Sequence, residues 1–571
     1  MFGFNLIINS EAQLPAIAAE DNLVVRETIW HNLKLQQFTL NKFLDDKLFV
    51  EDDEYVYAIE GILLNFSELC EKYSCNRQSL LPLLYKLKGE SFVTELRGSF
   101  SIVFCDKIKN IHYVYSDHIG SRFLFYQAVG QSLYLSSNIV ELCKLTHNKT
   151  LDKLGMYDLL CCGFQSAHHT IVENIRRIPA GYFLCINPEK VELKQYHRFT
   201  DKHVVKQTKE QYAANMEQLL RQAVVRVLNK NKEYGYDNYF PLSAGLDSRM
   251  VNFLARELTN DKIINFTYAE KDTQDAIVPP LIAKYLGNQL IFRQQDDHHF
   301  LTHFSKAVEI TDAQIVYGGA AEAYDLWEKL DKTNVGVIPN GVGGDCIVAT
   351  PIHKRITNYS YADFSMTPFL YDELRELIPK DYSQWYESKN INALYVVNFE
   401  CHGLGSPTAL RSFADSYSPF LDVDFVEYYL TIDPRERKDY SLYDYWIKQY
   451  HPQAMQWLHN GMKIGHRSKV LHIANRTIAM DELLERTAGF VKRRLQILTG
   501  LTNKQHNKQT KIVAESVCND FFNNNLHLLD FDKQLQKHVS EQYNQSAFPP
   551  AKLSALTLLA SVKMISEIDE K

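Results

Sequence analysis

The stretch YFPLSAGLDSRM at residues 239–250 runs from an apolar segment through a turn of small residues into a polar segment. This order predicts a strand, a tight loop and a helix N-terminus. Because Ser243, Ala244 and Gly245 place little bulk over the backbone, several N–H groups can converge there on one anion, assisted by the helix dipole. The loop is not a G-x-x-x-x-G-K-(S/T) loop, and it carries Asp247, an oxygen ligand suited to Mg²⁺. It indicates a phosphate site, with a plain strand-to-helix turn as the alternative.

The residues that follow this loop have a helical apolar face and then a second apolar run at 263–268. Strand, loop, helix and strand form the first unit of a parallel α/β sheet. Ligands of such sheets bind at the carboxyl ends of the strands. The apolar face consists of Val251, Leu254, Ala255 and Leu258.

Length and composition exclude several classes of protein. A chain of 571 residues predicts two or more domains, and a net charge of −7 without a basic stripe argues against binding to DNA or RNA. We expect no membrane span and a cytoplasmic location, because no apolar run approaches the ~20 residues that cross a bilayer. The ten cysteines lack a repeated zinc spacing and are expected to be reduced structural thiols.

Residues 1–199 are predicted to form a domain rich in β-strands, with one helix near 78–88. Short runs of aromatic and branched residues are separated there by polar turns, as is typical of strands. The expected strands cover 55–64, 101–105, 111–115, 123–126 and 133–136.

Several motifs of this first part resemble successive landmarks of the N-terminal glutaminase-type domain of asparagine synthetases. They are GILLN at 61–65, LRGSF at 96–100, DHIGSRFLFY at 117–126, YLSS at 134–137 and TIVENIRRIPAGY at 170–182. The resemblance implies an Ntn-type β-sandwich with αββα layers.

One position departs from the glutamine-using members of that family. They carry a nucleophilic cysteine after the initiator methionine, whereas this chain has Phe2, which cannot attack an amide. The glutamine-binding R-G-P-D stretch is also not recognisable between Arg26 and Lys42. We therefore expect residues 1–199 to be an inactive glutaminase-like domain, although Asn65 matches an asparagine of the family's oxyanion site.

After a polar linker at 200–208, residues 208–571 resemble the synthetase domain of the same family. This implies an α/β parallel-sheet ATP-pyrophosphatase domain, adenine nucleotide α-hydrolase-like, with a helical C-terminal part. The family loop S-G-G-x-D-S matches residues 243–248, with Ala244 for the first glycine. The apolar run at 335–338 predicts another buried strand, which leads into NGVGGD at 340–345. This segment resembles the family's S-G-E-G-A-D-E, so that Asp345 falls on the second magnesium aspartate. Val342 replaces the glutamate and Cys346 the final acid. The family uses that glutamate near the acyl acceptor, so its loss indicates a substrate other than the usual one.

Two further motifs supply the candidate catalytic residues. Asp415, in a segment that resembles E-A-R-V-P-F-L-D, is predicted to take a proton from an attacking amine, with a solvated aspartate on a helix surface as the alternative. Lys463, in GMKIGH at 461–466, resembles the lysine that is held over the activated carboxylate.

His299 and His303 are one helical turn apart, a spacing that can bind a metal. We expect a polar helix start instead, because the sequence offers no obvious third ligand.

The resemblance implies an ATP-dependent ligase that forms C–N bonds. A small-molecule or peptide carboxylate becomes an acyl-adenylate with release of pyrophosphate, and an amine or ammonia then displaces AMP. The cofactors implied are ATP and Mg²⁺. An intramolecular amide ligase similar to lasso-peptide cyclases or β-lactam synthetases is one alternative, and a non-catalytic binding or assembly subunit is another. A second copy of the chain or a protein of the same biosynthetic cluster stays open as a partner.

The candidate site residues fall into three groups. The predicted catalytic residues are Lys463 and Asp415, and the predicted metal ligands are Asp247 and Asp345. The predicted ATP- and pyrophosphate-binding residues are Leu242, Ser243, Ala244, Gly245, Asp247, Ser248, Thr267, Gly341 and Gly343.

Overall fold

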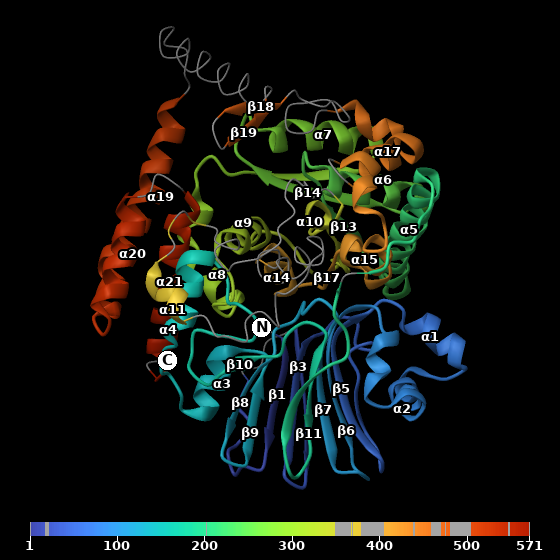
Figure 1. Ribbon diagram of the computed structural model, residues 1–571, viewed down its shortest axis with the longest axis vertical. Coiled ribbons are helices and arrows are strands. Elements are labelled where there is room, and N and C mark those ends of the chain that lie inside the picture. The colour runs from blue at the N-terminus through green and yellow to red at the C-terminus, as the bar shows by residue number, and fades with distance from the viewer. Residues whose placement is uncertain are drawn as a thin grey trace.

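The structure is a computed structural model. It describes residues 2–17, 22–200, 202–348, 367, 369, 371–377, 405–437, 440–457, 470–473, 476–479, 504–545 and 549–569. Side chains are described in these ranges except at 345, 346, 470–473, 476–479, 504–512, 545, 549 and 569. Figure 1 shows a β-sandwich at the bottom, an α/β part above it and a group of C-terminal helices along one side.

The first part of the chain folds into two six-stranded sheets with antiparallel neighbours. One sheet has the order β10 (Arg176–Arg177), β8 (Phe125–Val129), β9 (Ser132–Ser136), β1 (Gly3–Ile8), β3 (Leu33–Leu40), β2 (Leu23–Trp30). The other has the order β12 (Val191–Gln195), β11 (Tyr182–Ile186), β7 (Ile111–Ser116), β6 (Gly98–Asp106), β5 (Tyr55–Leu63), β4 (Phe49–Glu51).

The two sheets share one apolar core, to which Leu6 and Leu35 contribute from the first sheet and Val56 and Val103 from the second. Successive side chains of a strand point to opposite faces, so the second sheet also needs a cover on its other face. Helices α1 (Phe66–Tyr73) and α2 (Arg77–Lys88) provide it with η1 (Gly89–Glu95). The remaining helical segments of this part are α3 (Ile139–Thr146), α4 (Lys153–Tyr157) and η2 (Asp158–Cys162). The sandwich implied by the family resemblance is confirmed. The five expected strands correspond to β5–β9 and differ from them mainly at their ends, and the expected helix at 78–88 is α2. The other strands and helices of this part were not predicted.

The α/β part begins with the long helix α5 (Lys209–Tyr234). Thr208 caps its N-terminus in a capping box with Gln211, and Gly235 ends it with φ 72°. A parallel sheet follows with the order β13 (Asn238–Pro241), β14 (Ile263–Ala269), β15 (Gln289–Gln294). Helices α6 (Leu246–Leu258) and α7 (Gln274–Leu286) connect these strands, as predicted for a parallel α/β sheet.

A second parallel pair, β16 (Ile338–Pro339) and β17 (Ser416–Tyr417), contacts β13. The expected strand at 335–338 is therefore much shorter than predicted: Val335 forms only an isolated bridge with Asp237. The other elements between residues 299 and 479 are η3 (His299–Thr302), α8 (Phe304–Ile310), α9 (Gly318–Trp327), α10 (Gly344–Ile347), α11 (Asp372–Leu377), α14 (Gly405–Arg411), η5 (Pro419–Leu421), α15 (Val423–Tyr429), α16 (Pro434–Arg437), α17 (Ser441–Tyr450), η7 (Pro452–Gln456), β18 (Val470–Ile473) and β19 (Arg476–Ala479).

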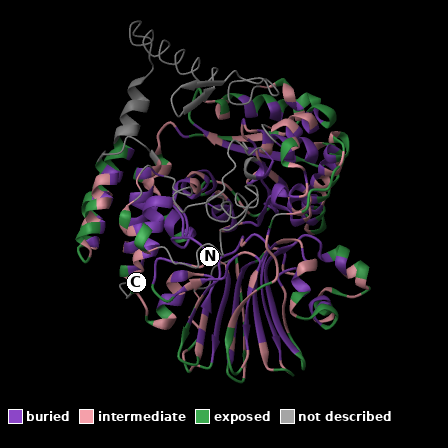
Figure 2. Cartoon of the chain, viewed as in Figure 1, coloured by how far each residue is buried: buried purple, intermediate pink, exposed green. Residues whose placement is uncertain are grey.

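The C-terminal helices lie beside both parts of the molecule (Figure 1). The last one, α21 (Pro549–Ser566), is largely buried (Figure 2) and packs on α8 and on η2. Its Thr557 Oγ1 accepts a hydrogen bond from the Tyr317 N–H at 3.3 Å. It thus joins the two parts of one chain. The other elements of this region are α19 (Lys504–Asn525), η8 (Leu526–Leu529), α20 (Lys533–Gln545) and η9 (Glu567–Asp569). Among the described residues, no helix has the length and apolar character needed to cross a membrane.

Candidate functional site

The loop at 243–248 connects β13 to α6, and its conformation is held by short polar contacts. The Ser243 N–H donates to Ser248 Oγ at 3.0 Å, and the two hydroxyl oxygens lie 2.8 Å apart. The Gly245 N–H donates to Ser243 Oγ at 3.1 Å. The serine hydroxyls therefore occupy the interior of the loop, where the sequence predicted an anion.

The Ala244 N–H does not point to the predicted anion position. It donates to Asp275 Oδ1 of α7 at 2.7 Å, and the Ala244 methyl belongs to the main apolar core. The extra methyl relative to the family loop is thus accommodated in the core, away from the cavity described below.

Arg249 anchors the loop from beneath, a role that the sequence did not indicate. Its side chain is fully buried and donates to the Ala244 carbonyl at 2.8 Å and to the Ala454 carbonyl of η7 at 2.9 Å. Burial lowers the pKa of the guanidinium to about 10. A buried cation bound to backbone carbonyls fixes the loop to a segment about 200 residues further along the chain.

A second loop, at 341–344, closes against the first. A Cβ atom on Gly341 would lie 2.5 Å from the Ser248 nitrogen, and one on Gly344 would lie 2.4 Å from Asp247 Cγ. Gly343 has φ 87°, and a Cβ there would meet Leu421 at 2.7 Å. Only glycine allows this approach, so the two predicted motifs meet in space.

Together the two loops border a cavity of about 810 Å³. Of the predicted nucleotide-binding residues, seven line it, whereas Ala244 and Gly343 do not. The seven are Leu242, Ser243, Gly245, Asp247, Ser248, Thr267 and Gly341. The rest of the wall comes mainly from the end of β14, from α9, from α14 and from Tyr440 and Tyr443.

Asp247 lies in the first turn of α6 at the junction of the two loops. Its Oδ1 accepts a hydrogen bond from the Tyr443 hydroxyl at 2.9 Å. Asp345, the second predicted metal ligand, lies in α10 directly after Gly344, but its side chain and that of Cys346 are outside the described residues. Lys463 also lies outside the described residues.

Asp415 is neither on a helix surface nor in the cavity wall. It is 1% exposed and immediately precedes β17. Its Oδ2 lies 3.2 Å from Lys47 Nζ, and its Oδ1 accepts from Arg122. Burial raises the pKa of this carboxyl, but the charges of Lys47 and Arg122 outweigh burial and leave it below its ordinary value.

The alternative of a solvated helix-surface aspartate is therefore wrong for Asp415. The geometry also does not support the predicted proton-accepting role, because the carboxylate is held between two cations of the sandwich. The side chain instead joins the two parts of the molecule.

Glu322 of α9 is a cavity residue that the sequence did not single out. Burial and the carboxylates of Asp275 and Glu270 raise the pKa of Glu322 to about 7. A carboxyl group with such a pKa exchanges protons near neutral pH. No local sequence pattern marks Glu322, because the acids that raise its pKa lie on other elements: Asp275 on α7, and Glu270 directly after β14.

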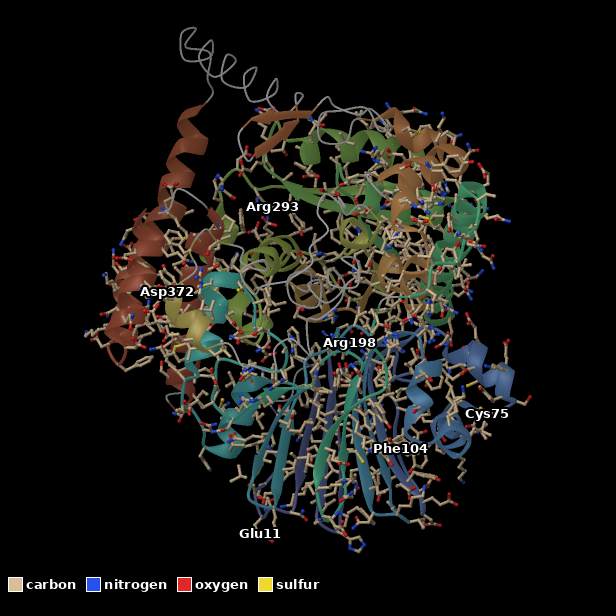
Figure 3. All side chains as sticks on the ribbon, in the orientation of Figure 1. Glu11, Cys75, Phe104, Arg198, Arg293 and Asp372 are labelled. Atoms are coloured by element: carbon tan, nitrogen blue, oxygen red, sulfur yellow. The ribbon has the colours of Figure 1, made fainter. Side chains whose placement is uncertain are left out.

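The histidine pair does have a third neighbour, contrary to the expectation from sequence. His299 Nδ1 and His303 Nε2 lie 3.3 Å and 3.6 Å from Asp325 Oδ1. Arg293, labelled in Figure 3 in the α/β part, donates from Nε to Asp325 Oδ2 at 2.9 Å. Since Asp325 is already surrounded by cationic and polar donors, the cluster is accounted for as a hydrogen-bonded network.

Phe2 and Asn65 occupy positions that the family resemblance assigns to a glutaminase site, and the structure shows what each of them contacts. Phe2 lines a second cavity, of about 830 Å³, bordered by residues of α3, α8 and α21. The Asn65 side chain accepts from the Arg97 N–H at 2.8 Å and donates to the Glu95 carbonyl at 2.9 Å. Asn65, which directly precedes α1, thus binds the backbone of the segment at 95–97, about 30 residues further along the chain.

Comparisons with known proteins agree with this architecture. Residues 38–197 match the family model of the glutamine amidotransferase domain, and residues 215–390 match that of asparagine synthase. Asparagine synthetase (glutamine-hydrolyzing) 2 of Bacillus subtilis (strain 168) is 25% identical over 327 residues, which cover 52% of this chain and 42% of that protein. Asparagine synthetase (glutamine-hydrolyzing) 1 of the same organism is 23% identical over 305 residues, covering 52% and 47%.

Among solved structures, a glutamine phosphoribosylpyrophosphate amidotransferase from B. subtilis, complexed with ADP and GMP, aligns with a TM-score of 0.22 and 11% identity. The alignment covers 46% of this chain and 51% of that one.

The chain thus combines an Ntn-type glutamine amidotransferase domain with an asparagine synthase domain. It belongs to an asparagine synthetase-like family. The matched region spans about half the length of these curated relatives.

Proposed function

We propose that the chain is an ATP-dependent ligase that forms a C–N bond through an acyl-adenylate. A substrate carboxylate attacks the α-phosphate of ATP and releases pyrophosphate, and an amine or ammonia then displaces AMP from the acyl carbon. Adenylation replaces hydroxide, a poor leaving group, by AMP, a good leaving group. The match to the asparagine synthase family supports amide formation as the type of reaction.

The observation that carries this proposal is the meeting of the two glycine-containing loops at one cavity. Ser243, Gly245 and Ser248 line it beside the N-terminus of α6, where a helix dipole favours phosphate. Gly341 brings the second loop against the same backbone. The adenosine part of ATP would lie toward Leu242 and Thr267, at the carboxyl ends of β13 and β14.

The residues at the junction fit a divalent cation on the pyrophosphate. The bare Gly344 leaves room for the Asp247 carboxylate, a hard oxygen ligand of the type Mg²⁺ prefers. Asp247, with Asp345 as the predicted second ligand, would hold Mg²⁺, which would neutralise charge on the leaving pyrophosphate. Lys463 is proposed to stabilise the charge that develops at the acyl group.

We also propose that the amidotransferase domain does not hydrolyse glutamine. Phe2 has no nucleophilic group, and the Asn65 carboxamide is occupied by backbone partners. The nitrogen would then come from free ammonia or from an amine, including one within the substrate itself.

Exchange of labelled pyrophosphate into ATP tests adenylation without knowledge of the amine. The protein is incubated with ATP, MgCl₂, labelled pyrophosphate and a panel of carboxylates that begins with aspartate. Exchange that depends on one carboxylate is expected, and Asp247→Asn should abolish it while the folded protein is retained. If no carboxylate in a broad panel supports exchange, the adenylation proposal is wrong.

Glutamine hydrolysis is measured separately as glutamate release in the presence and absence of ATP. Release above the protein-free control would contradict the proposed loss of glutaminase activity.

A further inference from the structure

Glu322 has a position that distinguishes it from the other carboxylates of the cavity. Asp247 accepts from the Tyr443 hydroxyl, Asp275 accepts from the Ala244 N–H, and Glu270 lies at the exposed rim, 3.6 Å from His298 Nδ1. Within the described part of the chain, the Glu322 carboxylate has no hydrogen-bond or ion-pair partner.

Hydrogen bonds and helix packing fix the backbone of α9 at Glu322, so the position from which its side chain extends is well defined. The Glu322 carbonyl accepts from Gln295 Nε2 at 3.2 Å, and α9 packs against α14, whose Ser406 and Leu410 also line the cavity. Ser406 Oγ donates to the Gly319 carbonyl at 2.9 Å, which ties the two helices together. The carboxylate is thus presented to the cavity from a rigid element.

Its charged neighbours all disfavour the ionised form. Asp275 of α7 and Glu270 after β14 both raise the pKa of Glu322, beyond the effect of burial. Tyr268, on β14, is a further titratable neighbour of Glu322, and burial together with the Glu322 charge raises the pKa of Tyr268 to about 12. Tyr268 is therefore neutral at physiological pH, whereas Glu322 exchanges its proton near neutrality.

Two positions that the family motifs suggest for proton transfer do not supply an acid to the cavity. At the position where related loops have a glutamate, this chain has Val342, an apolar residue in the cavity wall. Asp415, the acid predicted for proton transfer, is held by Lys47 and Arg122 away from the cavity. A carboxylate on α9 can replace both.

We propose that Glu322 is the general base that accepts the proton of the attacking amine, an inference that rests on the proposed function. The neutral amine nitrogen forms a bond to the acyl carbon of the adenylate, and the carbon–oxygen bond to AMP breaks. AMP leaves with that electron pair, and the proton shed by the nitrogen moves to a Glu322 carboxylate oxygen. The products are the amide, AMP and protonated Glu322, which returns its proton to solvent.

The two half-reactions separate this role from a structural one. With the carboxylate that supports exchange, pyrophosphate exchange reports adenylation and amide formation with ammonium chloride or methylamine reports the second step. We expect Glu322→Gln to lower amide formation about 10²–10⁴-fold, the usual contribution of a general base, and to leave exchange within about threefold of wild type. Glu328→Gln, a change just after the end of the same helix and outside the cavity wall, should leave both unchanged.

The pH profile and chemical rescue provide readouts that a purely structural residue would not change. Measured at a constant concentration of the neutral amine, amide formation by the wild type should fall below about pH 7, and this acidic limb should be absent in Glu322→Gln. Sodium formate should partly restore amide formation to Glu322→Ala, because a small carboxylate can occupy the space left by the side chain.

The outcomes separate the two proposals. Amide formation that is unaffected in Glu322→Gln, or an equal loss of exchange and amide formation, overturns the role of Glu322 while adenylation stands. If the wild type shows no exchange with any carboxylate, the proposed function fails and this inference falls with it.

Discussion

Glu322 and Asp415 are both acidic residues of the α/β part, yet their surroundings have opposite charge. Glu322 faces the carboxylates of Asp275 and Glu270 at the cavity, whereas Asp415 faces the cations of Lys47 and Arg122 at the contact with the sandwich. Burial alone raises the pKa of both groups. The neighbours decide the result: the pKa of Glu322 rises to about 7, and that of Asp415 falls below its ordinary value.

The difference shows how one type of side chain serves two purposes. A carboxylate kept ionised by cations is a permanent anion that can hold two parts of a protein together. A carboxyl group close to other acids binds and releases a proton near neutral pH, as a general base requires.

Removing the charge of Asp415 should have the largest effect on stability. Asp415→Asn leaves buried Lys47 and Arg122 without one of their anions, and we expect the free energy of unfolding to fall by about 3–5 kcal/mol. Urea unfolding followed by tryptophan fluorescence measures it.

A double variant tests the cause of that loss. Lys47→Met combined with Asp415→Asn removes one cation and one anion from the buried network. The ion pair of Arg122 and Glu60 remains, with Arg122 Nη1 3.2 Å from Glu60 Oε1. Much of the stability lost in Asp415→Asn should therefore return in the double variant. As a matched control, Glu192→Gln removes an acid from an exposed pair with Lys190 and should have no measurable effect. A loss for Asp415→Asn no larger than this control would show that the buried network does not join the two parts.

The second prediction concerns the pH dependence of stability at Glu322. Because its folded pKa of about 7 lies above the ordinary 4.5, the folded state binds more protons than the unfolded state between these values. Stability from this group is complete below about pH 4.5 and is lost as the pH rises through 7, by ~3 kcal/mol in total.

Glu322→Gln removes this dependence, so the variant should gain stability relative to wild type as the pH rises from 4.5 to 7. Urea unfolding at several pH values gives the free energy of unfolding of both proteins. The difference between the two values is compared, because buried Asp312, with a pKa of about 7, contributes a pH dependence that is equal in both. Asp415 should show the opposite direction, with its contribution lost only as the pH falls below about 4. A constant difference between Glu322→Gln and wild type would contradict the raised pKa.

The smallest predicted effect tests the neighbours of Glu322. Asp275→Asn keeps an oxygen acceptor for the Ala244 N–H but removes a negative charge, so the acidic limb of amide formation should move to lower pH by up to about 1 unit. Glu270→Gln should move it less, because Glu270 is at the rim and screened by solvent. The comparison requires full pH profiles of the three proteins, and a larger shift for Glu270→Gln would reverse the assigned order of influence.

The first loop could be predicted because its chemistry is local. A run of small residues between a strand and a helix determines the backbone path there, and most of the predicted residues do line the cavity. Ala244 and Gly343, which were also predicted to bind ATP, do not line the cavity, because adjacent residues of a loop can point to different sides. The strand expected at 335–338 was longer than the observed pairing, which depends on a partner segment at 416–417.

Asp415 shows where local reasoning fails. Its partner Arg122 lies 293 residues earlier in the chain, so neither an apolar period nor a motif could reveal the contact. The same holds for Arg249, which binds the backbone of η7, and for Glu322, whose influential neighbours lie on other elements.

The sequence by itself determined the β-rich first part, the parallel α/β unit and the strand–loop–helix path at 239–258, because periodicity and backbone sterics act between residues close in the chain. The arrangement of the first part as a sandwich came from the family resemblance. It also determined that position 2 carries no nucleophile. Only the tertiary structure decided which acid is a fixed anion and which can exchange a proton. Burial and neighbouring charge set a pKa, and both arise from residues that meet only when the chain has folded.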